Sequence, residues 1–379
     1  MTTSPHLVQT AVNISCTRDD LAHGTQLVGR AVSTRSSVQI LGGILLRADG
    51  EVLELAATDM EMSLRIGVPA NVREEGAVVV PGRLLVDIVR LLPVGDVSLE
   101  YRPGEGIVTL VSGSSEYRLH TYAADDFPRL PQAPEEGLAH LEREAFLETM
   151  GKVGRAASRD ESRPVLTGIL VHLEGTTLVM AATDSYRLSV KETALSSAVT
   201  ETLDAIVPAR ALTELARIAQ GSTAELLDVG VQENQVLFRV DGVSLTARRI
   251  DGQFPNYKQL RPETFEMELV LPREELLEVV RRVGIMAQRN SPLRLRFEEG
   301  QLTIQAQTQD VGEARESLPI PYAGDLLEIG FNPDFLRDGL ESVSESEVRL
   351  KLISPLRPGL ITGAGEDFWY LIMPIRLAG

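Results

Sequence analysis

Hydrophobic residues recur along this chain with two different periods. After Pro81, five apolar residues are separated by one, three or four positions, which predicts a helix with one buried face. These are Leu84, Leu85, Ile88, Val89 and Leu92. Thr17, followed three residues later by Asp20, predicts the start of an earlier helix. Short runs rich in Val, Leu and Ile, separated by turns such as Asp49-Gly50, predict antiparallel strands in hairpins. The runs are 44–47, 52–57, 97–101 and 107–111.

The same pattern occurs three times. VPGRLLVDIVRLLP at 80–93 recurs as VPARALTELARIAQ at 207–220 and, less closely, as FNPDFLRDGLESV at 331–343. LELAATD at 53–59 recurs as LVMAATD at 178–184, with LTIQAQT at 302–308 as a weaker third copy. Helical spacing also predicts helices at 146–157, 212–219, 276–283 and 335–343.

The copies lie about 125 residues apart, so each is long enough to be a domain rather than one turn of a solenoid. We therefore predict an α+β protein made of three tandem copies of a two-helix plus antiparallel-sheet domain. The predicted domains are residues 1–128, 138–256 and 267–379.

The composition excludes several classes of protein. One cysteine, Cys16, and five scattered histidines offer neither a disulfide within the chain nor a pair at metal-ligand spacing, so no metal or other cofactor is predicted. The N-terminus lacks a basic region followed by an apolar run, and no stretch approaches the about 20 apolar residues that span a bilayer. We expect a soluble cytoplasmic protein without a membrane partner.

Motifs for catalysis are absent from the sequence. The chain has no GxxxxGK[ST], GxGxxG, HExxH, GxSxG or CxxC pattern, so no catalytic residue is assigned. Asp59 and Asp184, the last residues of the repeated AATD, are the best candidates for a metal or acid–base pair. Because each recurs with its domain, the alternative is that each closes the turn after an apolar strand by accepting local backbone hydrogen bonds.

Basic residues recur on the predicted helices. Arg83 and Arg90 lie seven positions apart, as do Arg210 and Arg217 in the second copy, and seven residues make two helical turns. The first helix of the second copy adds Lys152, Arg155 and Arg159, and Arg35 follows the first helix of the chain. These eight residues would form a repeating basic surface that binds phosphates, although the net charge is −17. Solvated faces with salt bridges are the alternative, and the third copy is less basic.

The motifs taken together resemble the beta subunit of bacterial DNA polymerase III, the processivity sliding clamp, over essentially the whole chain. They are the AATD strand ends, the helices led by VP, GQFPNY at 252–257, EIGFNPDFL at 328–336 and YLIMPIRL at 370–377. The resemblance implies a non-catalytic, head-to-tail homodimeric ring with helices inside, which encircles duplex DNA without sequence preference. It also implies that the DNA polymerase III catalytic subunit, the clamp loader, other polymerases and repair proteins bind through short linear peptides.

The resemblance also implies a peptide groove between the second and third domains. Its residues would be Leu166, Thr183, Tyr186, Arg187, Leu188, Pro255, Leu260, Phe335, Met373, Pro374, Ile375, Arg376 and Leu377. Pro374 favours an edge, where a peptide could dock, over a central strand. Arg35 matches a DNA-contacting position of the family, and Ile285 matches a subunit-interface position. The sequence departs from the family at Gln259, where a basic residue is common, and at Arg163-Pro164-Val165, where aromatic residues are common.

Two other functions are compatible with parts of the sequence. A three-domain scaffold that binds peptides but never encloses DNA would keep the groove and lose the basic surface. A hydrolase that uses Asp59 or Asp184 would need a second clustered carboxylate or histidine, which the sequence does not offer.

Overall fold

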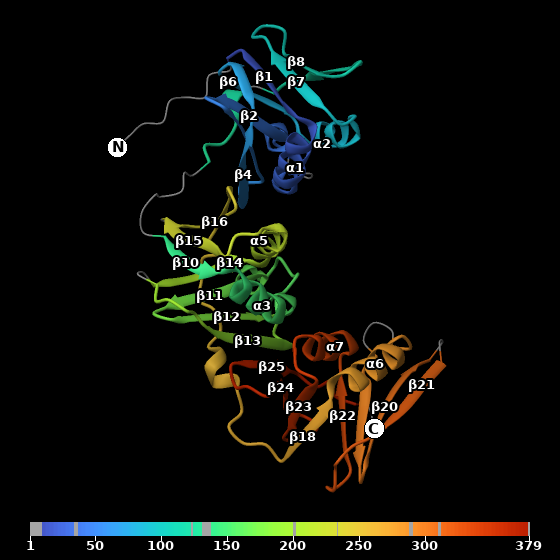
Figure 1. Cartoon of the computed structure of the whole chain (residues 1–379). Helices are drawn as coiled ribbons and strands as arrows, with labels where there is room; N and C mark the ends of the chain where they lie inside the picture. Colours follow the sequence, from blue (N-terminus) through green and yellow to red (C-terminus); the bar gives the residue numbers. More distant parts are fainter. Residues whose placement is uncertain are drawn as a thin grey trace. The chain divides into compact units, whose positions relative to one another are not determined.

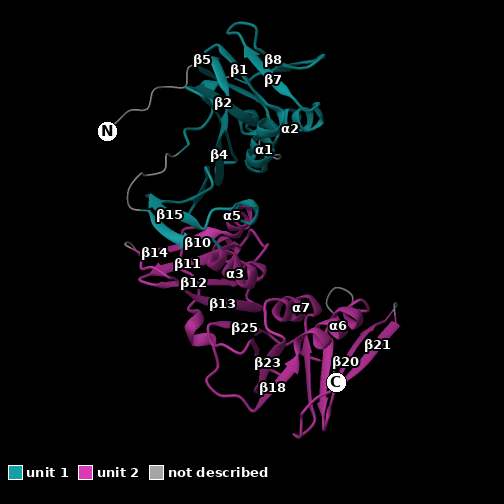
Figure 2. Cartoon of the chain, viewed as in Figure 1, with its two compact units in different colours: residues 1–143, 217–249 teal, residues 144–216, 250–379 magenta. Residues whose placement is uncertain are grey.

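The computed structural model describes residues 10–33, 37–122, 124–130, 138–199, 202–232, 234–287, 291–309 and 312–377. The chain divides into two compact units (Figure 2). The first consists of residues 1–143 and 217–249, and the second of residues 144–216 and 250–379.

The first unit carries helices α1 (Arg18–Val28) and α2 (Gly82–Leu91) and two antiparallel sheets (Figure 1). The five-stranded sheet has the order β5-β1-β7-β8-β9. Its strands are β1 (Val12–Thr17), β5 (Asn71–Glu74), β7 (Asp96–Tyr101), β8 (Ile107–Ser112) and β9 (Ser115–His120). The eight-stranded sheet has the order β10-β15-β16-β17-β4-β3-β2-β6. Its strands are β2 (Gly43–Asp49), β3 (Val52–Thr58), β4 (Met62–Pro69), β6 (Gly76–Pro81), β10 (Ala139–Glu142), β15 (Leu226–Gln232), β16 (Gln235–Val240) and β17 (Val243–Arg248).

The second unit contains another eight-stranded antiparallel sheet and a four-stranded one. The larger sheet has the order β14-β11-β12-β13-β25-β24-β23-β18. Its strands are β11 (Gly168–Glu174), β12 (Thr177–Thr183), β13 (Arg187–Ala194), β14 (Leu203–Pro208), β18 (Met267–Pro272), β23 (Glu347–Leu352), β24 (Gly359–Thr362) and β25 (Phe368–Ile372). The smaller sheet, β21-β20-β19-β22, consists of β19 (Leu293–Glu298), β20 (Gln301–Thr308), β21 (Gly312–Pro319) and β22 (Leu327–Phe331).

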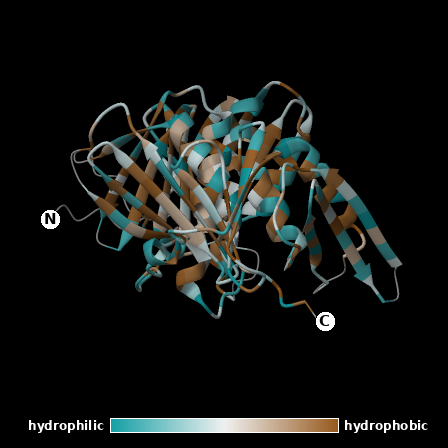
Figure 3. Cartoon of the chain, turned by 90° about the horizontal axis from the view of Figure 1, so that it is seen from below, coloured by the Kyte–Doolittle hydropathy of each residue, from teal (hydrophilic) through white to brown (hydrophobic). Residues whose placement is uncertain are grey.

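The helix predicted at 146–157 ends at Val153. The other helices of the second unit are two at predicted positions, 276–283 and 335–343, and a short one that the sequence did not predict. They are α4 (Pro164–Thr167), α6 (Arg273–Gly284) and α7 (Pro333–Glu341), while α3 (Arg143–Val153) and α5 (Ala209–Gly221) each contain a boundary between the units. Leu277 and Val280 of α6 and Leu336 of α7 are buried in one core with Phe297 and Phe331 of the smaller sheet. Bands of apolar and polar residues follow one another along the strands (Figure 3), and buried and partly exposed positions alternate along β8.

Local signals from the sequence are confirmed in the structure. Thr17 is the N-cap of α1, and its hydroxyl oxygen accepts a hydrogen bond from the Asp20 backbone N–H at 3.2 Å. Gly50 has φ +60° in the turn between β2 and β3, a conformation that glycine adopts without steric cost. The hairpin turn predicted at Asp49-Gly50 is therefore confirmed.

The repeat is visible in backbone hydrogen bonds as well as in sequence. Glu61 O, just before β4, accepts from Arg248 N at 2.9 Å, and Tyr186 O, just before β13, accepts from Met373 N at 2.9 Å. In each case the later strand, β17 or β25, extends the sheet of an earlier domain. The compact units follow these continuous sheets, so the strands of the predicted middle domain 138–256 are shared between two units.

Candidate functional site

A tight turn between β12 and β13 presents Tyr186 to solvent. The Asp184 carboxylate oxygen Oδ1 accepts hydrogen bonds from the backbone N–H groups of Tyr186 (2.9 Å) and Arg187 (3.0 Å). Ser185 has φ +78°, and the side chain of Tyr186 is 60% exposed. Asp184 therefore shapes the turn, from which Tyr186 projects into solvent.

The equivalent turn of the first unit is built in the same way. Asp59 Oδ1 accepts from the backbone N–H groups of Glu61 (3.1 Å) and Met62 (2.8 Å), and Met60 has φ +76°. The structural interpretation of the repeated aspartates is thus confirmed.

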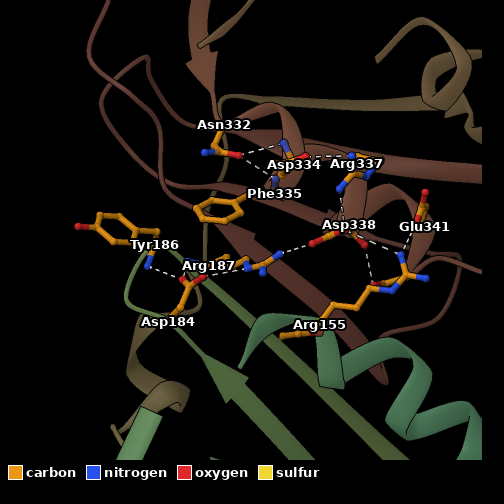
Figure 4. A network of polar contacts seen from close by, with 12 residues as sticks. Arg155, Asp184, Tyr186, Arg187, Asn332, Asp334, Phe335, Arg337, Asp338 and Glu341 are labelled. Atoms are coloured by element: carbon orange, nitrogen blue, oxygen red, sulfur yellow. Dashed lines mark hydrogen bonds and ion pairs between the residues drawn. The ribbon is translucent and has the colours of Figure 1, made fainter. Parts of the chain in front are cut away.

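Arg187 lies at the start of β13 with a side chain only 10% exposed (Figure 4). Its Nε donates to Asp184 Oδ2 at 3.0 Å, and a terminal nitrogen donates to Asp338 Oδ2 at 2.5 Å. The guanidinium carbon lies 4.4 Å from the centroid of the Phe335 ring, a cation–π contact. Burial by itself would lower the pKa of Arg187, but Tyr370, Asp338 and Asp184 outweigh burial and raise it. Arg187 therefore stays charged and joins the middle-domain sheet to α7.

The segment after β25 contacts the middle domain at Met373, whose backbone N–H donates to Tyr186 O at 2.9 Å. β25 is a central strand and ends at Ile372, so Pro374 lies beyond the sheet rather than on its edge. Ile375 N donates to Gly330 O at 2.8 Å. A Cβ atom at Gly330 would lie 2.8 Å from Ile375 O and 2.7 Å from a Leu377 methyl group, so glycine is required for this approach.

The thirteen predicted groove residues all belong to the second unit and differ in their exposure. Leu166, Thr183, Leu188 and Arg187 are buried or nearly so and act as supports. Tyr186, Leu260 and Met373 are 60%, 50% and 41% exposed, which leaves their apolar side chains accessible to solvent. Pro255, Phe335, Pro374, Ile375 and Leu377 are half-buried, and Arg376 is exposed. Leu260 lies in a 3₁₀ turn, Tyr257–Leu260, next to a buried cluster that contains Trp369 and Leu188.

Sequence reasoning missed several residues that hold this site in place. Asp338 fixes Arg187 by accepting a hydrogen bond from its guanidinium group. Tyr370 fixes α7, because its hydroxyl donates to Phe335 O at 2.9 Å. Asp338 lies three positions after Phe335, so helical spacing could have placed both on one side of α7.

The residues predicted to bind phosphates differ in exposure and in their ion pairs. Arg83 and Arg90 are exposed on α2, Arg210 and Arg217 are exposed on α5, and Arg159 is exposed after α3. Arg155 lies in a 3₁₀ turn, Gly154–Ala156, and is paired with Glu341 and Asp338. Arg35 lies outside the described residues.

Lys152 contradicts the prediction of a surface cation. Its side chain is 10% exposed, and its Nζ lies 3.1 Å from Glu148 and 5.3 Å from the centroid of the Phe368 ring. Spacing placed Lys152 on one side of α3, but it could not show that Phe368, far along the chain, covers that side.

Three other features bear on function: the reactivity of the cysteine thiol, a metal site and a membrane-spanning helix. Burial, followed by Asp20 and Asp96, raises the pKa of the Cys16 thiol to about 12, which keeps it protonated. The described part of the chain holds no cluster of three His, Cys, Asp or Glu side chains able to bind a metal. Among the helices that the structure describes, none is long and apolar enough to cross a membrane.

Models of the three domains of the DNA polymerase III beta subunit match the chain in order. The N-terminal domain matches residues 12–131, the central domain residues 140–256 and the C-terminal domain residues 258–376. The chain belongs to the DNA polymerase III beta subunit family. The fold expected from the resemblance, three clamp domains of helices and antiparallel sheets, is thereby confirmed.

Individual members of the beta subunit family match over nearly the full length. A beta sliding clamp from Streptomyces coelicolor is 36% identical, over 97% of this chain and 100% of that protein. A sliding clamp structure from Bacillus subtilis superposes with a TM-score of 0.91 at 27% identity, covering 97% of this chain and 100% of the other. A DnaN sliding clamp from Pseudomonas aeruginosa, bound to griselimycin, has a TM-score of 0.88 at 28% identity and the same coverage.

Proposed function

We propose that this chain is a sliding clamp of which two copies, arranged head to tail, encircle duplex DNA and tether the replicative polymerase. The observation that carries the proposal is the ordered match of all three family domains from residue 12 to residue 376. In this role the protein performs no catalytic step and acts in the cytoplasm, where a bacterial chromosome is copied.

Enclosure accounts for the modest number of basic residues. A protein that is held on DNA by topology needs few phosphate contacts, and weak contacts allow it to slide. The exposed arginines of α2 and α5 are suited to this, since both helices carry two arginines seven residues apart. The net charge of −17 would discourage DNA from binding elsewhere on the surface.

Two sheet edges support the head-to-tail arrangement. β9 ends the five-stranded sheet of the first unit, and β21 ends the four-stranded sheet of the second. Unpaired edges of this kind are templates for a strand of another chain. Exposed apolar side chains accompany them in the same domains, namely Leu91 at the end of α2 and Ile285 after α6, which is 79% exposed. Pairing β9 with β21 of a second copy would cover both edges, and a ring closes when the second contact forms.

Dimerisation can be tested with charge substitutions at the proposed contact. Ile285→Glu and Leu91→Glu are expected to convert the dimer to a monomer in analytical ultracentrifugation at micromolar concentration, because each buries an unpaired carboxylate in the interface. Leu356→Glu is the matched control, since Leu356 is also exposed but lies outside the proposed contact. A monomeric wild-type protein, or dimers that survive both substitutions, would count against the ring.

The peptide site is proposed to bind short linear segments of the polymerase, the clamp loader and repair proteins. Tyr186, Leu260 and Met373 offer exposed apolar contacts over a buried support, which suits anchoring side chains of a peptide. The griselimycin complex of the Pseudomonas aeruginosa clamp is in keeping with a peptide-like ligand. Tyr186→Ala should weaken binding of labelled griselimycin about tenfold, or ~1.4 kcal/mol, whereas Leu326→Ala, at an exposed site elsewhere, should not.

The decisive experiment for enclosure compares circular and linear DNA. Protein loaded on a nicked circular plasmid should stay bound in moderate salt and run off once the plasmid is cut. Equal loss from circle and line would favour a peptide-binding scaffold that does not enclose DNA.

A further inference from the structure

One side of α7 is held by arginines from the middle domain. Phe335, Asp338 and Glu341 follow one another at intervals of three, so they lie along one side of this helix. Figure 4 shows Arg187 reaching Asp338 and Arg155 reaching both acidic residues. The helix that carries the peptide-site residue Phe335 is therefore attached at two points.

The second attachment is the contact between Arg155 and Glu341. Arg155 hydrogen bonds to Glu341 Oε2 and lies 3.9 Å from Asp338 Oδ1. Glu341 also accepts from Arg281 of α6 at 2.9 Å. Its burial would raise its pKa, but hydrogen bonds from Arg281 and Arg155 outweigh burial and lower it. Glu341 is therefore charged at neutral pH and holds two arginines from different domains.

The competing role for Arg155 is contact with DNA phosphates. A phosphate would have to replace Glu341, whose side chain is 20% exposed, and would leave that carboxylate with Arg281 alone. Arg159, four positions later, is exposed and meets no such obstacle. The geometry therefore favours a role for Arg155 inside the protein.

We propose that Arg155 is a positioning residue for the peptide site, which it serves by tying the C-terminal end of α7 to the middle domain. Arg187 fixes Asp338 near the middle of α7, and Arg155 fixes Glu341 one turn later. Together they keep the Phe335 ring under the Arg187 guanidinium, at the junction from which Tyr186 and Met373 project. This inference rests on the proposed peptide-binding function.

The test measures binding of fluorescent griselimycin to the full-length protein by anisotropy. Arg155→Gln should weaken binding about threefold, equivalent to ~0.7 kcal/mol, because Arg155 is 45% exposed and its ion pair is partly screened. Arg155→Lys should restore part of the loss. In a Glu341→Gln background, Arg155→Gln should have little further effect, because their pairing is already lost. The ratio of wild-type to Arg155→Gln affinity should approach one as salt is raised.

The matched control is Arg349→Gln. Arg349 pairs with Glu268 at 3.5 Å and is similarly exposed, but it lies on β23 and its pair includes no residue of α7. An equal loss of affinity in this control would overturn the proposal. So would an Arg155→Gln protein that binds griselimycin normally but leaves circular DNA faster, since that is the result expected of a phosphate contact.

Failure of the peptide site itself gives a different result. If neither wild-type protein nor Tyr186→Ala binds the probe, or if the two bind it equally, both the site and the role of Arg155 are refuted. If Tyr186→Ala weakens binding and Arg155→Gln does not, only the positioning role is refuted.

Discussion

The buried charge of Arg187 makes a strong prediction for Asp338→Ala. The two side chains are 10% and 16% exposed, so their ion pair is largely shielded from water. Removing one partner of a buried pair costs about 3–5 kcal/mol when the remaining charge has no other partner. Asp184 stays 3.0 Å from Arg187, so the buried guanidinium keeps one of its two carboxylate partners. We therefore expect a loss of about 2–3 kcal/mol in the free energy of unfolding, or about 5–10 °C in Tm for a unit of this size.

The chain contains a suitable reporter for this measurement. Its one tryptophan, Trp369, is buried in β25 beside Tyr370, in the same compact unit as Asp338. Urea unfolding followed by tryptophan fluorescence therefore reads the stability of the unit that contains the substitution. The control is Asp334→Ala, on the same helix, because Asp334 is 67% exposed and its pair with Arg337 should change stability by less than about 0.5 kcal/mol.

Two results would refute the reasoning. A loss below about 0.5 kcal/mol in Asp338→Ala would mean that the Arg187 guanidinium is well solvated. An equal loss in Asp334→Ala would mean that any acidic residue on α7 has the same effect. Adding Arg187→Met to Asp338→Ala should recover part of the loss, because it removes the unpaired charge.

Three further predictions concern other parts of the chain. Cys16, with a pKa of about 12, should not react with a thiol reagent at pH 8 in the native protein and should react rapidly in urea. Gly339→Ala should lower the free energy of unfolding in urea by about 1–3 kcal/mol, because the new Cβ would lie 2.8 Å from ring carbons of Tyr370. Gly151→Ala in α3 should raise it by about 0.5–1 kcal/mol, because its Cβ would meet no atom within 4 Å. The pKa of Glu341 is lowered on folding, so its ionised carboxylate stabilises the folded protein. This contribution to the free energy of unfolding is full above the ordinary glutamate pKa and is lost as pH falls through the lowered value. The Glu341→Gln protein should therefore show a smaller loss of stability between neutral and acid pH, and an identical pH profile would contradict the assignment.

The repeat and the local turn chemistry could be predicted from sequence. Apolar spacing located the longer helices, since it depends only on residues one to four positions apart, whereas the four-residue helix α4 is too short to show a period. The cap at Thr17 and the turn at Gly50 are local in the same sense. The repetition of AATD favoured turns over a catalytic pair for Asp59 and Asp184, because copies in separate domains would keep the two carboxylates apart.

Features that depend on distant contacts could not be predicted in this way. Lys152 was predicted on a basic surface, but its Nζ lies 5.3 Å from the centroid of the Phe368 ring, and no local pattern records that contact. Arg155 was grouped with the DNA-facing residues because its spacing matched, whereas the structure pairs it with Glu341, 186 positions later. The division into two units depends on which strands join across the predicted domains, and hydrophobic period alone does not specify strand partners.

The shared sheets have a consequence for any attempt to dissect the molecule. Cutting out the middle segment alone would separate β17 from β4 and β13 from β25. The fragment would then carry two newly bare borders with open amide and carbonyl groups, both flanked by apolar residues. Such a piece should self-associate through these borders, so truncation is best made at the ends of whole eight-stranded sheets.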